Sequence, residues 1–527
     1  MFNARFTKFA TMLRKALDFY NKNGPATTIA KLRYKISSKI IYQKYSYRSV
    51  LNKFPEKFSP TQPQSSASPN DWITIIDSAA GNALQELTTR LAISVNAAST
   101  LSALRAALDD DKYYRILDDL FTFEGVQTAL RDRAPYALVQ ASELPQISGT
   151  PRRRKILFIT ALFPSLYHGG GNHVRYFIKI LSENNDIYLA TSFSPDNDDK
   201  ALQAVAPYCQ SIYKIPNWRF GNNQAEIHKW LKGMRMDVVH YEWPGSLENY
   251  DPTYGKLHIF TYMESNSLRT FMDLQSLPAL SPTWASKFAE MIHNLRQELA
   301  DTARMDARIA VTTKDGEFFR SLVPGQEYAV INHGVTFDEY TLPEVTPEPF
   351  TLVFSGNYEH YPNTDAMTFF FNEIWEGVRK EVPDVRIYLV GADPLQNLKR
   401  FADGQRVIVT GAVPDVRPYI QKASICIAPL ISGAGIRVKV IEYAALRRSF
   451  VATSIATTDL AFIDGIDYLR ADTAGEFTQK IITLLKDEQM ARRMGNSVHE
   501  TARRYYDNHS LVDYQTRVYD TLEKTKC

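Results

Sequence analysis

The chain has 527 residues, of which 44% are apolar and 23% are charged. This is the composition of a globular protein of about three domains, and it excludes global disorder and a fibrous repeat. A net charge of only +3 excludes a chain that binds nucleic acid along its whole length, and three scattered cysteines (Cys209, Cys426 and Cys527) favour a reducing compartment without disulfides.

Residues 1–150 are predicted to form a basic, mainly helical extension. Residues 1–60 carry thirteen Lys and Arg against two acidic residues, with tyrosines among the cations. Such a segment can lie on an anionic lipid surface, although a solvated or partner-docking extension is an equal alternative. Proline, serine and glutamine are frequent near residues 54–70, which predicts a linker there.

The location of the protein follows from what the sequence lacks. No stretch reaches the roughly 18 continuous apolar residues of a membrane-spanning helix, and the basic N-terminus has no apolar signal-peptide region. We therefore expect a cytoplasmic protein that can bind peripherally to the inner membrane face through residues 1–60.

Two series of alternating strand and helix patterns follow the extension. Short apolar runs of parallel-strand type begin at residues 156, 186, 237, 259 and 307, and again at 351, 385, 407, 424 and 450. Three prolines between 341 and 350 separate the series, and residues 476–526 look helical. The sequence therefore predicts an α/β fold of two tandem Rossmann-like domains, at 151–340 and 341–505, and a final helix at 506–527. Ligands are expected in the cleft between the domains.

A glycine-rich segment follows the first strand of the first domain. It is predicted to be a loop before a helix that runs from Val174 to Leu181. Backbone N–H groups in such a loop can approach an anion or an acceptor, whereas a flexible turn is the alternative. The residues concerned are Gly169, Gly170, Gly171, Asn172 and His173.

A second glycine-rich turn follows the strand at 424–427 and leads into a helix. Its N–H groups and the helix dipole can face a diphosphate, and two cations can balance the growing charge of a leaving group. A carboxylate about two helical turns further on can accept hydrogen bonds from a ribose. The residues concerned are Gly433, Gly435, Ile436, Arg437, Lys439 and Glu442. In the same domain, Asn363 is predicted to be the N-cap of a helix.

The pattern GxGxRxKxxE at 433–442 resembles a characteristic block of the family 4 glycosyltransferases, as do residues 355–363, 390–394 and 410–416. The resemblance covers about residues 152–520. It implies a GT-B fold and a UDP- or GDP-sugar donor on the second domain, where Gly356 and Asn357 would also contact it. It further implies transfer with retention to a glycan, lipid-linked or protein acceptor on the first domain, as in polysaccharide biosynthesis. No metal or cofactor is implied, no nucleic acid is expected as a partner, and the last helix should cross back to the first domain.

The chain departs from the family pattern at several positions. Ala434 stands where the earlier of two glutamates is common, and a basic pair is replaced by residues 357–360. The resemblance leaves three candidates for the group that assists at the reacting carbon, His240, Glu242 and Glu264, each of which has a structural role as its alternative. Two other functions stay open, namely a GT-B-shaped nucleotide-sugar epimerase and a degenerate, non-catalytic binding module.

Overall fold

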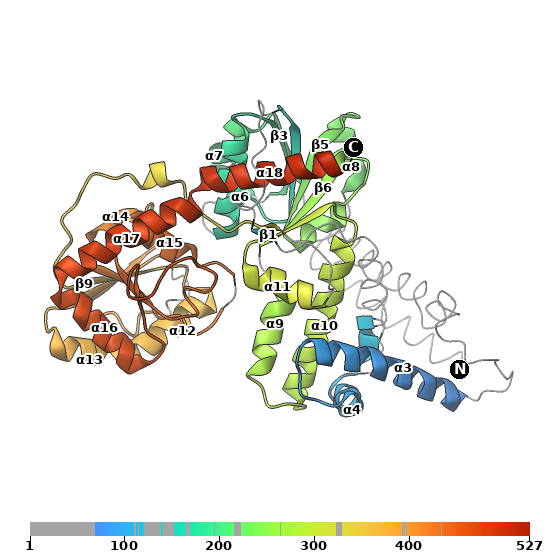
Figure 1. The fold of residues 1–527 in the computed structure, drawn as a ribbon, viewed down its shortest axis with the longest axis horizontal. Coiled ribbons are helices and arrows are strands. Elements are labelled where there is room, and N and C mark those ends of the chain that lie inside the picture. Colours follow the sequence, from blue (N-terminus) through green and yellow to red (C-terminus); the bar gives the residue numbers. More distant parts are fainter. Residues whose placement is uncertain are drawn as a thin grey trace, which may run out of the picture.

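The computed structural model describes residues 69–109, most of 112–120, and residues 139–140, 152–164, 169–193, 195–215, 223–263, 265–322, 329–392, 396, 398–433 and 435–526. The basic segment at 1–60, most of the predicted linker at 54–70, and Glu264 lie outside the described residues. Figure 1 shows two domains joined by an extended connection and by a long C-terminal helix.

The first domain is built on a sheet with the strand order β1-β8-β7-β6-β5-β2-β3-β4. All neighbouring strands in it are parallel. Five of its strands were predicted from apolar runs, whereas the short or half-exposed strands β1, β4 and β8 gave no such run. The strands are β1 (Val139–Gln140), β2 (Lys155–Thr160), β3 (Asp186–Ser192), β4 (Ser211–Ile215), β5 (Met236–Glu242), β6 (Gly255–Tyr262), β7 (Ala307–Ala310) and β8 (Ala329–Val330).

Helices cover both faces of this sheet. Successive strand residues point to opposite faces, so Phe158 of β2 packs with α6 on one side and Leu157 packs with α10 on the other. This is the doubly wound arrangement that alternating elements predict. The helices are α3 (Pro69–Arg90), α4 (Ala97–Ala107), α6 (Gly169–Leu181), α7 (Pro195–Val205), α8 (Gln224–Leu231), α9 (Asn266–Gln275), α10 (Pro282–Thr302) and α11 (Thr313–Leu322).

The described part of the predicted extension packs against the first domain. Leu84 of α3 and Leu104 of α4 belong to the same buried cluster as Phe288 of α10, and β1 adds an edge strand beside β8. Helix α3 already begins at Pro69, within the stretch predicted as a linker. Helices α3 and α4 and strand β1 therefore belong to this domain.

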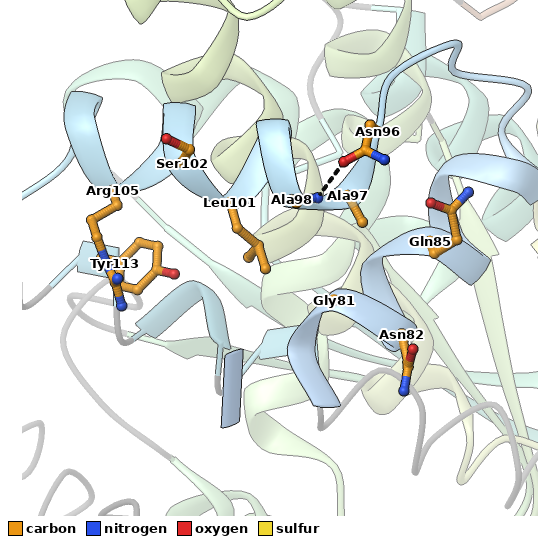
Figure 2. Close-up of a pocket in the computed structure, with 10 residues that line it drawn as sticks. All are labelled: Gly81, Asn82, Gln85, Asn96, Ala97, Ala98, Leu101, Ser102, Arg105 and Tyr113. Atoms are coloured by element: carbon orange, nitrogen blue, oxygen red, sulfur yellow. Dashed lines mark hydrogen bonds between the residues drawn. The ribbon is translucent and has the colours of Figure 1, made fainter. Parts of the chain in front are cut away.

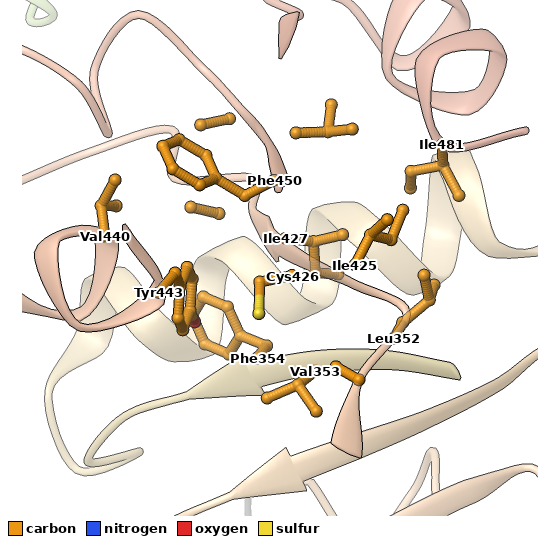
Figure 3. Packing of buried hydrophobic residues seen from close by; sticks show 14 of the residues in the cluster. Leu352, Val353, Phe354, Ile425, Cys426, Ile427, Val440, Tyr443, Phe450 and Ile481 are labelled. Atoms are coloured by element: carbon orange, nitrogen blue, oxygen red, sulfur yellow. The ribbon is translucent and has the colours of Figure 1, made fainter. Parts of the chain in front are cut away.

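The second domain contains a parallel sheet with the strand order β11-β10-β9-β12-β13-β14. Cys426 of β12 is fully buried among apolar side chains, as its apolar sequence context predicts (Figure 3). The strands are β9 (Thr351–Ser355), β10 (Arg386–Val390), β11 (Val407–Gly411), β12 (Ile425–Ala428), β13 (Phe450–Ala452) and β14 (Leu469–Arg470). The helices are α12 (Tyr361–Phe369), α13 (Trp375–Glu381), α14 (Arg417–Lys422), α15 (Val438–Ala445), α16 (Ala474–Lys486) and α17 (Glu488–Tyr506).

The C-terminal helical region breaks where the chain passes between the domains. Helix α17 ends at Tyr506, and α18 (Asn508–Lys526) lies across α6 and β6 of the first domain (Figure 1). At the break, the N–H of Val335 in the interdomain linker donates to Tyr506 O at 2.9 Å, and the N–H of Asn508 donates to Val335 O at 2.9 Å. Gly334 is needed here because a Cβ would lie 2.3 Å from Tyr506 O. Within the described ranges, none of the helices combines the length and the apolar character that a membrane crossing requires.

Candidate functional site

A small cavity of about 50 Å³ lies between the two domains. The backbone N–H of Lys314, at the start of α11, donates to Asp459 Oδ2 of the second domain at 3.1 Å beside it. The turn predicted to bind the donor faces this interdomain space. The cavity is lined by Leu268, Met272, Thr312, Lys314 and Asp315 of the first domain and by Gly433, Gly435, Arg437, Ile455, Thr458 and Asp459 of the second.

The turn takes a backbone shape that requires its glycines. Gly433 has φ 110° and Gly435 has φ 75°, both in the left-handed region that side chains disfavour. Arg437 then caps α15 and donates from Nη1 back to Gly435 O. Ile436 packs against the core of the second domain, so the backbone around Gly435 is the part of the turn turned towards the first domain.

Lys439 lies half-buried behind this turn. Its Nζ donates to Asn363 Oδ1 at 2.6 Å and lies 3.9 Å from the ring centroid of Phe354. Among the described residues, no carboxylate lies within ion-pair distance of Nζ. Burial, followed by the nearby charge of Arg437, lowers the pKa of Lys439 to about 7. Its burial therefore disfavours the charged ammonium, which a nearby anion would stabilise.

Gly356 and Asn357, two of the predicted donor residues, sit beside Lys439. A Cβ on Gly356 would lie 2.9 Å from Lys439 Nζ and 3.0 Å from Asn363 Nδ2, so a larger residue would displace both side chains. Asn363 is not the N-cap that the sequence predicted, because α12 begins at Tyr361 after His360. Instead, Asn363 Nδ2 donates to Asn357 O at 2.7 Å while its oxygen binds the lysine. No local sequence signal indicates this role, since the lysine is 76 positions away.

Glu442 faces the interdomain linker. Tyr340, at the end of the one-turn helix η5 (Phe337–Tyr340), donates a hydrogen bond to Glu442 Oε1 at 2.9 Å. Burial raises the pKa of Glu442, although this hydrogen bond opposes the shift. Glu339, which precedes Tyr340 in η5, accepts a hydrogen bond from Tyr176 and another, at 2.9 Å, from Lys179 of α6. Helix α6, the linker and the donor side are therefore joined by consecutive polar contacts.

His240 does not reach the cleft in this structure. Its ring is fully buried against Phe158, and Nε2 shares hydrogen bonds with Tyr519 Oη at 2.6 Å and Gln515 Nε2 at 3.2 Å, both on α18. Burial lowers the pKa of His240 to about 3, so the ring is neutral. Helix α18 covers the ring and docks on it through these hydrogen bonds, so a role of His240 at the reacting carbon stays a prediction.

Glu242 is the last residue of β5, at the carboxyl edge of the sheet. Its side chain is 4% exposed, Oε1 accepts a hydrogen bond from Thr261 Oγ1 at 3.2 Å, and Oε2 has no partner among the described residues. Burial raises the pKa of Glu242 well above its usual range, and the hydrogen bond from Thr261 opposes the shift. The next residue, Trp243, has φ 65°, an unfavourable backbone for a non-glycine residue.

The glycine-rich segment of the first domain is helical rather than a loop. Helix α6 begins at Gly169 instead of Val174, so the glycines form its first turn. A Cβ on Gly170 would lie 2.9 Å from Trp243 Cζ2, which explains why a residue without a side chain stands there. His173 is buried and stacks on His333 of the linker, with ring centroids 4.3 Å apart. Burial and then His333 lower the pKa of His173, so this ring is neutral too.

Gly171 and Asn172 complete the predicted acceptor segment. Asn172 Oδ1 accepts a hydrogen bond from Arg175 Nη2 at 2.8 Å within the same helix. Next to this segment, His333 Nε2 lies 3.3 Å from Met263 Sδ. The start of α6, the linker and the end of β6 thus meet at one edge of the first sheet.

A separate groove of about 540 Å³ lies between α3 and α4 (Figure 2). Its rim carries amide side chains, of which Asn96 caps α4 through the N–H of Ala98 at 2.8 Å. No predicted site residue lines it. The groove belongs to the helical side of the first domain rather than to the interdomain cleft.

Comparison with known proteins decides the class of the second domain. Residues 349–487 match the family model described as glycosyl transferases group 1. The chain carries a group 1 glycosyltransferase domain. No curated protein matches the sequence of this glycosyltransferase.

The fold of the glycosyltransferase is similar to several solved structures of low sequence identity. Sucrose-phosphate synthase from Thermosynechococcus elongatus superposes with a TM-score of 0.54 at 16% identity, over 71% of this chain and all of that one. Anabaena HepE, solved with UDP and glucose, gives 0.53 at 14%, over 70% and all of the respective chains. A mutant of S. aureus TarM, solved with fondaparinux, α-GlcNAc-glycerol and UDP, gives 0.51 at 10%, over 70% and all. The predicted GT-B fold is confirmed.

Proposed function

We propose that the protein transfers a glycosyl group from a nucleotide diphosphate sugar on its second domain to an acceptor on its first domain. The observation that carries this proposal is the turn at 433–437, whose left-handed glycines and Arg437 line the interdomain cavity, with Lys439 behind it. A glycine turn followed by a helix N-terminus suits a phosphate group because its N–H groups are unpaired and the helix dipole is positive there.

The residues of this site supply what a leaving diphosphate requires. Arg437 and a protonated Lys439 stabilise the negative charge that grows on the leaving group as the bond between sugar and diphosphate breaks. Glu442 can exchange its hydrogen bond from Tyr340 for one from a ribose hydroxyl. Donor binding would then break the hydrogen bond between Glu442 and Tyr340 and so free this end of the linker.

The cavity must widen for a donor to enter. About 50 Å³ holds a water molecule or two, whereas pockets for small molecules measure about 300–1,000 Å³. The contact between Lys314 N and Asp459 Oδ2 spans the two domains at this point, so opening would break it. We therefore infer that the described conformation is a closed one and that the domains separate during turnover.

The donor base and acceptor are narrower parts of the proposal. A UDP-sugar is the first choice, because the HepE structure, whose fold this chain shares, contains UDP, and a GDP-sugar is the alternative. The TarM complex with α-GlcNAc-glycerol supports a glycan acceptor on the first domain. Transfer with retention follows from the family resemblance. Glu242, a buried carboxyl group at the strand edge, is our first candidate for a role at the reacting carbon.

A donor screen tests the proposal. The thermal unfolding of the protein is followed with UDP, GDP and their sugars. At a hundredfold excess over the dissociation constant, the matching nucleotide should raise the free energy of unfolding by about 2.7 kcal/mol. Mass detection of a transferred or hydrolysed sugar separates a transferase from an epimerase, whose product would be an isomeric nucleotide sugar. Binding without any product would instead favour the non-catalytic module, and no binding of any nucleotide would refute the proposal.

The membrane proposal for residues 1–60 needs its own assay. Vesicles with anionic lipid should bind the full chain at low salt and lose it as salt rises, because the attraction of exposed cations is screened. Equal binding to neutral vesicles, or none at low salt, would contradict it.

A further inference from the structure

A buried carboxylate of the first domain holds the start of α9. Glu298 of α10 is 4% exposed, and its Oε1 accepts hydrogen bonds from the N–H groups of Asn266 at 2.7 Å and Ser267 at 3.4 Å. Its Oε2 accepts hydrogen bonds from Ser265 Oγ at 3.2 Å and from Ser267 Oγ. Both serines are fully buried, so water cannot replace the carboxylate as their acceptor.

The segment held in this way forms one wall of the interdomain cavity. Leu268 and Met272 of α9 line the cavity opposite the donor turn. Just before α9, the carbonyl of Met263 lies 3.8 Å from where a Cβ on Gly435 would stand. The thioether of Met263 also contacts His333 of the linker. Met263, just after β6, therefore lies near the donor turn and contacts the linker, while α9 lines the cavity beside it.

Glu298 itself does not line the cavity. We propose that Glu298 is a positioning residue of the glycosyl-transfer reaction, which fixes the turn from β6 to α9 against the donor turn of the closed enzyme. The inference rests on the proposed function. Without the carboxylate, two N–H groups at a helix N-terminus lose their acceptor and the two buried hydroxyls can donate only to each other, across 3.1 Å, so the first turn of α9 would loosen. A displacement of about 1 Å at a reacting site can cost about a hundredfold in rate.

The test compares Glu298→Ala and Glu298→Gln with Glu290→Gln. Glu290 lies on the same helix, is exposed and pairs with Lys287, so it is the matched control. Three quantities are measured on the full chain: UDP affinity by calorimetry, amide hydrogen exchange of peptides covering 262–275, and the kcat and KM for UDP-glucose consumption per folded protein.

For Glu298→Ala we expect kcat/KM to fall by about tenfold or more. UDP affinity should stay within about twofold, because UDP is proposed to bind the second domain, and exchange should rise only in 262–275. Glu298→Gln keeps one acceptor oxygen, so its kcat/KM and its exchange rates should lie between those of Glu298→Ala and the wild type. Glu290→Gln should match the wild type in both.

Two kinds of result would overturn the inference. If the wild-type enzyme consumes UDP-glucose and the kcat/KM of Glu298→Ala lies within about twofold of the wild-type value, the inference about Glu298 is overturned while the proposed function stands. A loss of activity accompanied by equal loss of UDP affinity, or by faster exchange throughout the protein, would show a general folding role instead. A wild-type chain that neither binds a nucleotide nor consumes its sugar would overturn the proposed function, and the inference with it.

Discussion

The unusual state of Lys439 makes a measurable prediction about nucleotide binding. In the free protein its amine is held by Asn363 and the ring of Phe354, and burial with Arg437 nearby lowers its pKa to about 7. A bound diphosphate would raise that pKa towards the ordinary value of about 10.4. Binding should therefore take up a proton, and it should weaken as the pH rises above 7, because the charged form becomes scarce in the free protein.

The magnitude follows from this shift. About half of the Lys439 side chains are charged at pH 7 and about 3% at pH 8.5, whereas nearly all would be charged in the complex. UDP affinity should thus fall by about fifteenfold across this range, with uptake of about one proton at pH 8.5. Calorimetry in buffers of different ionisation enthalpy measures both quantities.

Two variants sharpen this test. Lys439→Arg stays charged and should bind UDP with the same affinity at pH 7 and 8.5. Lys422→Met removes an exposed lysine of the same domain, which pairs with Glu348, and should keep the wild-type pH dependence. Equal wild-type affinity at the two pH values, or proton uptake that survives in Lys439→Arg, would refute the reasoning.

Three further substitutions test the packing and the site. Gly170→Ala should destabilise the protein by about 1–3 kcal/mol in urea unfolding, because its Cβ would press on an indole, while Gly475→Ala, which meets open space in α16, should not destabilise it. Arg154 is 3% exposed and pairs with two acidic residues of α18. Arg154→Met should therefore lower the free energy of unfolding by about 1–3 kcal/mol and speed tryptic cleavage within α18. The control Arg153→Met, at an exposed position, should lower it by less than about 1 kcal/mol. Glu442→Ala should weaken UDP binding about tenfold without changing the unfolding midpoint by more than a few degrees; unchanged affinity would remove its ribose role.

Local patterns in the sequence predict both the two-domain fold and the glycine turn that opens α15. Apolar runs that alternate with helical patterns mark parallel strands, because a strand covered on both faces is apolar along its length. Gly433 and Gly435 predict a turn with a left-handed backbone, which residues with a side chain disfavour. The cations that follow them indicate an anionic ligand. These features are local in the chain, so the sequence displays them directly.

Only the tertiary structure decided which side chains serve that turn. The bond from Lys439 to Asn363, the bond from Tyr340 to Glu442, and the cover that α18 places over His240 each join residues far apart in the chain. Glu298 reaches the start of α9 in the same way. Such pairs depend on how helices pack against the sheets and on where the chain crosses between domains. Local patterns indicate strands, helices and turns, but packing decides which distant side chains meet.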